Sequence, residues 1–220
     1  MKIAIVTFPG SAGEMDILEA LLTVGFTENN ILFKNEQTTS LEDFAGVFIP
    51  GGAVYANAVR PGAVAKVTPV AKALITFAQS GKPLIGIGNG FQILTELALL
   101  PGGFLKNKHL KTVNGYVTVA ETFNADQLPQ TFKLPVSHLY GNYYVDEKNL
   151  QELKENNQIV LRYTEHNPNG SVDAIAGVRN KAGNVIGMMP KPERAMSKLV
   201  GSEDGRMFFE LFSDSIKRGL

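Results

Sequence analysis

The segment Gly86-Ile87-Gly88-Asn89-Gly90 has the spacing of a turn that carries a catalytic nucleophile. In such Gly-x-nucleophile-x-Gly turns, which join a strand to a helix, the central residue has strained backbone angles and the flanking glycines avoid steric clash. The next backbone N–H and the helix N-terminus stabilise a negatively charged oxygen. The central residue here is Gly88, which has no side chain for attack. Because glycine adopts positive φ freely, it should relax the turn by ~1 kcal/mol while removing its chemistry.

Two simpler interpretations compete for the same segment. A dinucleotide-binding Gly-x-Gly-x-x-Gly sequence fails, because Phe91 occupies its last position. A plain tight turn between a strand and a helix stays open on the pentapeptide alone, because the motif is weak by itself.

The composition excludes several other kinds of site. The 220 residues contain no cysteine, which rules out disulfides, thiolate metal sites and cysteine nucleophiles. His109, His138 and His166 are too widely separated for a His-x-x-x-His metal site, and we expect neither a metal nor a cofactor. The 21 basic and 21 acidic residues balance, so no electrostatic attraction to nucleic acid or to an anionic membrane is expected.

The apolar runs are also much shorter than the ~20 residues of a membrane span. Met1 and Lys2 lead directly into a strand-like run, so no signal peptide is expected. Together with the lack of cysteine, this is compatible with the cytoplasmic location that we expect.

Apolar patterns predict the elements that position the turn. Continuous apolar runs, typical of strands buried on both faces, lie at 3–6, 31–33, 46–49 and 84–87. Helices are expected over 14–24, 63–79 and 91–100, so that strands and helices alternate as in a parallel sheet covered by helices. Shorter strands (116–119, 159–163, 174–178 and 185–189), a hairpin loop at 180–183 and a helix over 206–217 follow. We expect one domain over residues 1–220.

The longer sequence from Gly86 to Leu94, followed by Leu99-Leu100-Pro101-Gly102, carries a resemblance to a known family. So do Phe8-Pro9-Gly10-Ser11, Ile49-Pro50-Gly51-Gly52 and the segment 183–190, in the same order. These segments resemble class I glutamine amidotransferases, and within them the glutaminase subunits of phosphoribosylformylglycinamidine synthase. The resemblance spans nearly the whole chain. It implies a three-layer, flavodoxin-like α/β sandwich with a mostly parallel central sheet.

The departures from the family lie where the resemblance places its chemistry. In the family, a Cys at the tip of the turn attacks the glutamine amide, a His in Met-Pro-His-Pro-Glu-Arg takes its proton, and the Glu orients that His. Here Gly88 stands at the Cys position and Lys191 at the His position, while Glu193 remains. A lysine with an ordinary pKa of ~10.4 is a poor base at neutral pH. One expectation for Lys191 and Glu193 is a surface ion pair worth ~1 kcal/mol or less.

The pocket implied by the resemblance has changed as well. Gly51, Gly52 and the N–H of Asn89 would still form its oxyanion-binding wall. The family's His-Gly-Glu-Gly segment, however, reads His138-Leu139-Tyr140-Gly141, so that a phenol replaces a carboxylate.

Three functions follow from these observations. The first, which we favour, is an inactive glutaminase-like subunit that stabilises or regulates the large synthetase subunit of the purine pathway, since loss of such a nucleophile costs ~10⁶-fold in rate. The second is a small-molecule-binding protein that holds an amino acid or anion at the helix N-terminus. The third is an enzyme that uses Lys191, Glu193 or His138 in new roles.

Overall fold

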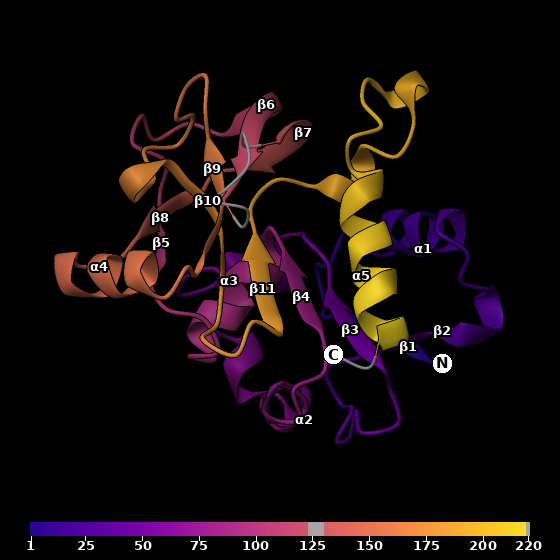
Figure 1. The fold of residues 1–220 in the computed structure, drawn as a ribbon. Coiled ribbons are helices and arrows are strands. Elements are labelled where there is room, and N and C mark those ends of the chain that lie inside the picture. Colours follow the sequence, from indigo (N-terminus) through magenta and orange to yellow (C-terminus); the bar gives the residue numbers. More distant parts are fainter. Residues whose placement is uncertain (123–129, 219–220) are drawn as a thin grey trace.

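The computed structural model describes residues 1–122 and 130–218, and its centre is a nine-stranded mixed sheet (Figure 1). The strand order is β2-β1-β3-β4-β11-β10-β9-β6-β7. Neighbours from β2 to β11 pair in parallel, and those from β11 to β7 pair antiparallel. The strands are β1 (Ile3–Val6), β2 (Ile31–Lys34), β3 (Gly46–Ile49), β4 (Leu84–Ile87), β6 (Val113–Glu121), β7 (Thr131–His138), β9 (Ile159–Tyr163), β10 (Ile175–Arg179) and β11 (Val185–Met188), with β5 (Gly103–Leu105) and β8 (Asn142–Tyr144) in a separate pair.

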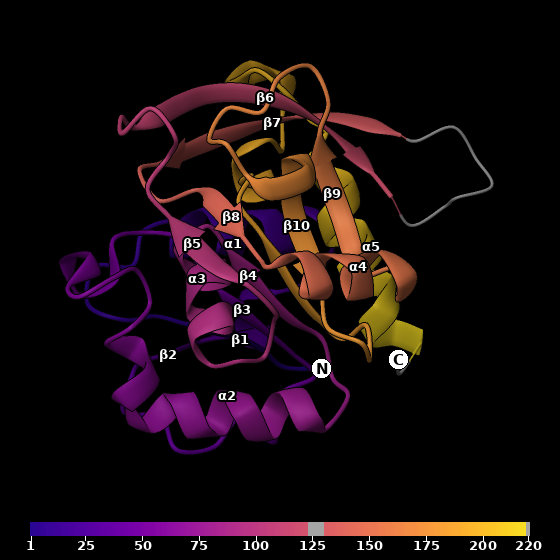
Figure 2. The ribbon, with the colours of Figure 1, turned by 90° about the vertical axis from the view of Figure 1, so that its left-hand side faces the viewer.

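Helices cover both faces of this sheet (Figures 1 and 2). The helices are α1 (Glu14–Thr23), α2 (Pro69–Gln79), α3 (Asn89–Glu96), α4 (Glu147–Glu155) and α5 (Arg206–Arg218). Apolar side chains of α2, α3 and α4 share one core with one face of the sheet, and those of α1 and α5 share a second core with the other. Strands β1, β3 and β4 are buried along their whole length, which is why their sequences are apolar without alternation. The expected three-layer α/β sandwich is therefore confirmed.

Two of the expected helices have different limits. Helix α2 begins at Pro69 rather than at residue 63, because the residue before a proline avoids helical angles and Thr68 is extended (φ −86°, ψ 156°). A short 3-10 helix over Ala65–Val67 precedes it. Helix α3 begins directly after Gly88 and ends at Glu96, since Ala98 adopts a left-handed conformation with φ 55°.

Other elements were not predicted. Strand β7 contains Pro135, which the sheet tolerates because β7 is its last strand and one side of its backbone has no neighbour. Helix α4 has a single buried residue, Leu153. Its sequence therefore shows no apolar stripe from which a helix could be predicted. Its start is fixed by Asp146, whose side chain accepts a hydrogen bond from the backbone N–H of Asn149 at 2.8 Å.

Candidate functional site

Gly88 lies between β4 and α3 and has φ 57° and ψ −109°. Residues with a Cβ are strained at such angles, whereas glycine is not. Its N–H donates to the carbonyl oxygen of Met188 at 2.8 Å, and its own carbonyl oxygen accepts from Gln92 at 3.3 Å. The segment is therefore a sharp strand-to-helix turn held on both sides by hydrogen bonds, as the nucleophile-turn interpretation predicts.

The space around the three glycines of this turn differs sharply. A Cβ on Gly86 would lie 2.6 Å from the backbone of Gly90, and a Cβ on Gly90 would lie 2.1 Å from the carbonyl oxygen of Ile49. A Cβ on Gly88 would meet only the Cα of Gly51 at 3.7 Å and the Cε of Lys191 at 3.9 Å. The flanking positions therefore require glycine, while the tip has room for a side chain.

The loops after β1 and β3 border the tip. The N–H of Ala12 donates to Gly51, and the N–H of Ala53 donates to Gly10, both at 2.9 Å. A Cβ on Gly52, where φ is 136°, would lie 2.3 Å from the carbonyl oxygen of Gly10. The two loops are thus packed backbone against backbone, and Gly51 lies beside the tip as expected.

Asn89 links three segments through its side chain, a role that its sequence position did not suggest. Its Oδ1 accepts from the N–H of Val54 at 2.8 Å, and its Nδ2 donates to Gln92 at 2.5 Å. Gln92 in turn donates to the carbonyl oxygen of Tyr140 at 2.5 Å. The buried amides of α3 therefore fix the loop after Gly52 and the turn after β7 relative to the tip.

Lys191 follows β11 and is 7% exposed. Its backbone N–H donates to Pro135 at 2.9 Å, and its Nζ lies 3.2 Å from the position that a Cβ on Gly51 would take. Burial lowers the pKa of Lys191, and the charge of Glu193 opposes this effect. The lysine side chain therefore occupies the space beside Gly88 and Gly51.

Glu193 is 4% exposed, and neither of its carboxylate oxygens has a hydrogen-bond partner within the described part of the chain. Burial raises the pKa of Glu193 to about 7, against the effect of Lys191. Among the described residues, no ion pair within 4.0 Å includes Lys191 or Glu193. The expectation of a surface ion pair was therefore wrong, because the packing of this segment against α1 and β7 removes both side chains from water.

His138, at the end of β7, is 9% exposed. The Oδ1 of Asn169 accepts a hydrogen bond from the N–H of Ser171 at 3.1 Å, which fixes the orientation of the Asn169 amide. The amide Nδ2 of Asn169 then lies 3.2 Å from the Nε2 of His138 and donates to it. The proton of the neutral ring is then on Nδ1, which has no hydrogen-bond partner among the described residues. Burial and the charge of Lys191 lower the pKa of His138 to about 4, which makes it a weak base.

Tyr140 lies half-buried in the turn after β7, with the Nζ of Lys106 5.8 Å from its ring centre. Neither Tyr140 nor Leu139 comes within 4 Å of a Cβ on Gly88. Arg194, next to Glu193, pairs with Asp16 of α1 at 2.8 Å. Asp16 is the neighbour that sequence reasoning missed, since 178 residues separate the two and no local pattern connects them.

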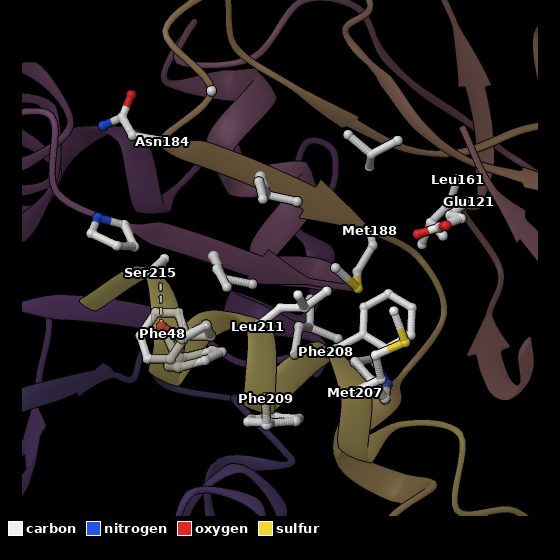
Figure 3. A pocket seen from close by; sticks show the side chains of 18 of the residues that line it. Phe48, Glu121, Leu161, Asn184, Met188, Met207, Phe208, Phe209, Leu211 and Ser215 are labelled. Carbon is white, nitrogen blue, oxygen red and sulfur yellow. Dashed lines mark hydrogen bonds between the residues drawn. The ribbon is translucent and has the colours of Figure 1, made fainter. Parts of the chain in front are cut away.

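A groove of about 430 Å³ lies elsewhere, between α5 and the sheet (Figure 3). Met188 and Phe208 point into it from opposite sides. It reaches Ile87 and Pro192 but neither Gly88 nor Lys191. Its lining is mostly apolar and brings no nucleophile beside a base, so the chemistry predicted from the sequence belongs to the turn at Gly88 and not to this groove.

Two further kinds of site are absent from residues 1–122 and 130–218. No three His, Asp or Glu side chains gather where they could hold a metal ion. None of the described helices combines the length and hydropathy needed to cross a membrane.

Comparison with known proteins identifies relatives over almost the whole chain. Residues 1–210 match the family of CobB/CobQ-like glutamine amidotransferase domains. The chain is similar to one from the structure of PurLQS from Thermotoga maritima, with 34% identity, a TM-score of 0.86 and coverage of 98% of each chain. It shares its fold with a protein from Thermoplasma acidophilum that is described as part of a GMP synthase, at 14% identity, a TM-score of 0.65 and coverage of 99% and 96%.

Proposed function

The chain belongs to the family of CobB/CobQ-like glutamine amidotransferase domains, and from this premise we propose that it is a glutaminase-like subunit of purine biosynthesis that does not hydrolyse glutamine. Its similarity to the PurLQS protein, over 98% of both chains, supports the pathway. The geometry around Gly88 supports the loss of activity.

The backbone of the tip carries this proposal. Hydrolysis through an acyl-enzyme requires a side-chain nucleophile at the tip of the turn, and Gly88 offers a hydrogen atom there. Among the described residues, and apart from its chain neighbours Ile87 and Asn89, Lys191 is the sole side chain within 4 Å of a Cβ on Gly88, so no hydroxyl group replaces the missing nucleophile. His138 and Glu193 are buried acids or bases without a nucleophile to activate.

A glutaminase assay with restored residues tests the loss of activity. We expect the natural protein to release no glutamate above a heat-denatured control. The double variant Gly88→Cys/Lys191→His should become covalently labelled by a glutamine-mimicking diazoketone, because a Cβ at the tip has no neighbour closer than 3.7 Å. Glutamate release by the natural protein that Lys191→Ala abolishes would overturn the proposal.

The large synthetase subunit is the partner that we propose. The similarity to the PurLQS protein supports this assignment. Mixed with the large subunit of the same organism at micromolar concentration, the chain should co-elute in gel filtration. The complex should then use ammonium salts but not glutamine as the nitrogen donor. Separate elution, or glutamine-dependent synthesis, would contradict the assignment.

A further inference from the structure

Lys191 presents an amine without a partner to the space above the turn. The residue is only 7% exposed, and within the described ranges its Nζ forms no hydrogen bond or ion pair. Buried lysines are normally paired, because an isolated ammonium group loses its hydration. Its Cε lies 3.9 Å from the position of a Cβ on Gly88. The amine therefore occupies the place where chemistry at this turn would occur.

Burial makes the neutral amine easier to reach at Lys191 than at an exposed lysine. Burial lowers the pKa of Lys191, the charges of Glu193 and Asp16 raise it, and that of Arg194 lowers it again. Asp16 is already paired with Arg194 at 2.8 Å. Because Glu193 has a pKa raised to about 7, it is largely uncharged below that pH and then stabilises the ammonium less. A desolvated neutral lysine is the form that attacks carbonyl carbons.

The helix that begins at Asn89 supplies a place for negative charge. The first N–H groups of an α-helix have no acceptor within the helix, and its dipole favours an anion at this end. Helix α3 starts directly after Gly88, and a Cβ on Gly88 would lie 3.9 Å from the Cε of Lys191, so the N-terminus of this helix lies near the lysine side chain. A molecule that carries both a carbonyl group and a carboxylate would use both features.

We propose that Lys191 binds small 2-oxo acids covalently, as an imine. The lone pair of Nζ attacks the carbonyl carbon, the C–N bond forms, and the carbonyl oxygen takes up a proton to give a carbinolamine. The nitrogen then loses a proton, and the hydroxyl group leaves as water after accepting a proton from Glu193, the buried acid on this segment. The protonated imine that results returns its proton to the Glu193 carboxylate. One amine and one carbonyl thus give one imine and one water, with no oxidant or reductant. This activity goes beyond the subunit role and does not depend on it.

Reductive trapping tests the proposal on the full chain. The protein is incubated with glyoxylate and sodium cyanoborohydride at pH 7.5, and the carboxymethylated lysines are quantified by peptide mass spectrometry. Lys191 should react about tenfold faster than the exposed Lys66 and Lys198, which serve as internal controls. In concentrated urea all three should react alike. Equal rates in the folded protein, or faster reaction of the exposed lysines, would overturn the proposal.

Variants separate a reactive lysine from a merely accessible one. Below pH 7, where the Glu193 carboxyl group is mostly protonated and its replacement removes little charge, Glu193→Gln should slow the labelling of Lys191 while leaving that of Lys66 unchanged. The labelling rate of Lys191 should reach its plateau at a lower pH than that of Lys66. A Glu193→Gln variant that is folded by circular dichroism and labels at the natural rate would exclude a role for this carboxyl group. If the labelling rates of Lys191 and Lys66 depend on pH in the same way, Lys191 is not an activated nucleophile and the proposal fails.

Discussion

Glu193 and His138 should affect stability with opposite dependence on pH. The pKa of Glu193 rises from 4.5 to about 7 on folding, so the folded protein keeps this proton more tightly than the unfolded chain. Its stabilising effect is complete below pH 4.5 and is lost as the pH rises through 7. At about 1.4 kcal/mol per pH unit, the loss amounts to about 3 kcal/mol.

His138 compensates for this loss. Its pKa falls from 6.5 to about 4 on folding, so its stabilising effect is present above pH 6.5 and is lost as the pH falls through 4. The magnitude is again about 3 kcal/mol. Between about pH 4.5 and 6.5, Glu193 and His138 together carry one proton in the folded chain and one proton in the unfolded chain. The contribution of the pair to the free energy of unfolding should therefore be nearly flat from about pH 4.5 to 7.5.

The variant Glu193→Gln should reveal the pH dependence that His138 alone gives to the free energy of unfolding. Relative to the natural protein, its free energy of unfolding should increase by about 3 kcal/mol between about pH 4.5 and 7.5, whatever constant cost the amide adds. His138→Gln should change it by the same amount in the opposite direction. Urea unfolding followed by fluorescence or circular dichroism measures both, with the exposed Glu19→Gln as the matched control. If Glu193→Gln tracks the natural protein and Glu19→Gln across this range, the argument from burial fails.

Two further predictions concern the turn itself. Gly90→Ala should cost about 3 kcal/mol, because its Cβ would lie 2.1 Å from the carbonyl oxygen of Ile49, whereas Gly88→Ala should cost about 1 kcal/mol for backbone angles alone; equal costs in urea unfolding would contradict the difference in space. Asn89→Ala should cost about 2 kcal/mol and speed hydrogen exchange at the N–H of Val54, which loses its 2.8 Å acceptor. Unchanged exchange at Val54 would show that the amide does not hold this loop.

Local patterns in the sequence predicted the turn and its supporting elements well. Strand β4 was predicted at its observed limits, because an unbroken apolar run identifies a strand buried on both faces. The two flanking glycines were predicted to be required by sterics, and the contacts of Gly86 and Gly90 show why. Such features depend on residues close together in the chain.

The surroundings of Lys191 could not be predicted in the same way. Its burial depends on β7, whose Pro135 accepts a hydrogen bond from its N–H, and β7 itself was not predicted. The environment of Glu193 depends on α1, which lies far away in the sequence. A charged residue next to a proline in a polar segment indicates a surface loop, and tertiary packing overrides that local signal.

The parallel pairing of β4 with β11 has a consequence for movement. Gly86 faces Gly187 and Ile87 faces Met188 in one ladder, and the N–H of Gly88 extends it by donating to Met188. Gly88 follows β4 directly, and Lys191 follows the end of β11 after Met189 and Pro190. Both strands lie in the centre of the sheet, where hinge motion would break several hydrogen bonds at once. The pairing of β4 with β11 therefore resists any widening of the site between these two strands. Any adjustment to a guest must come from the loops at 9–13 and 50–57, which makes those loops the places where size selection would be altered.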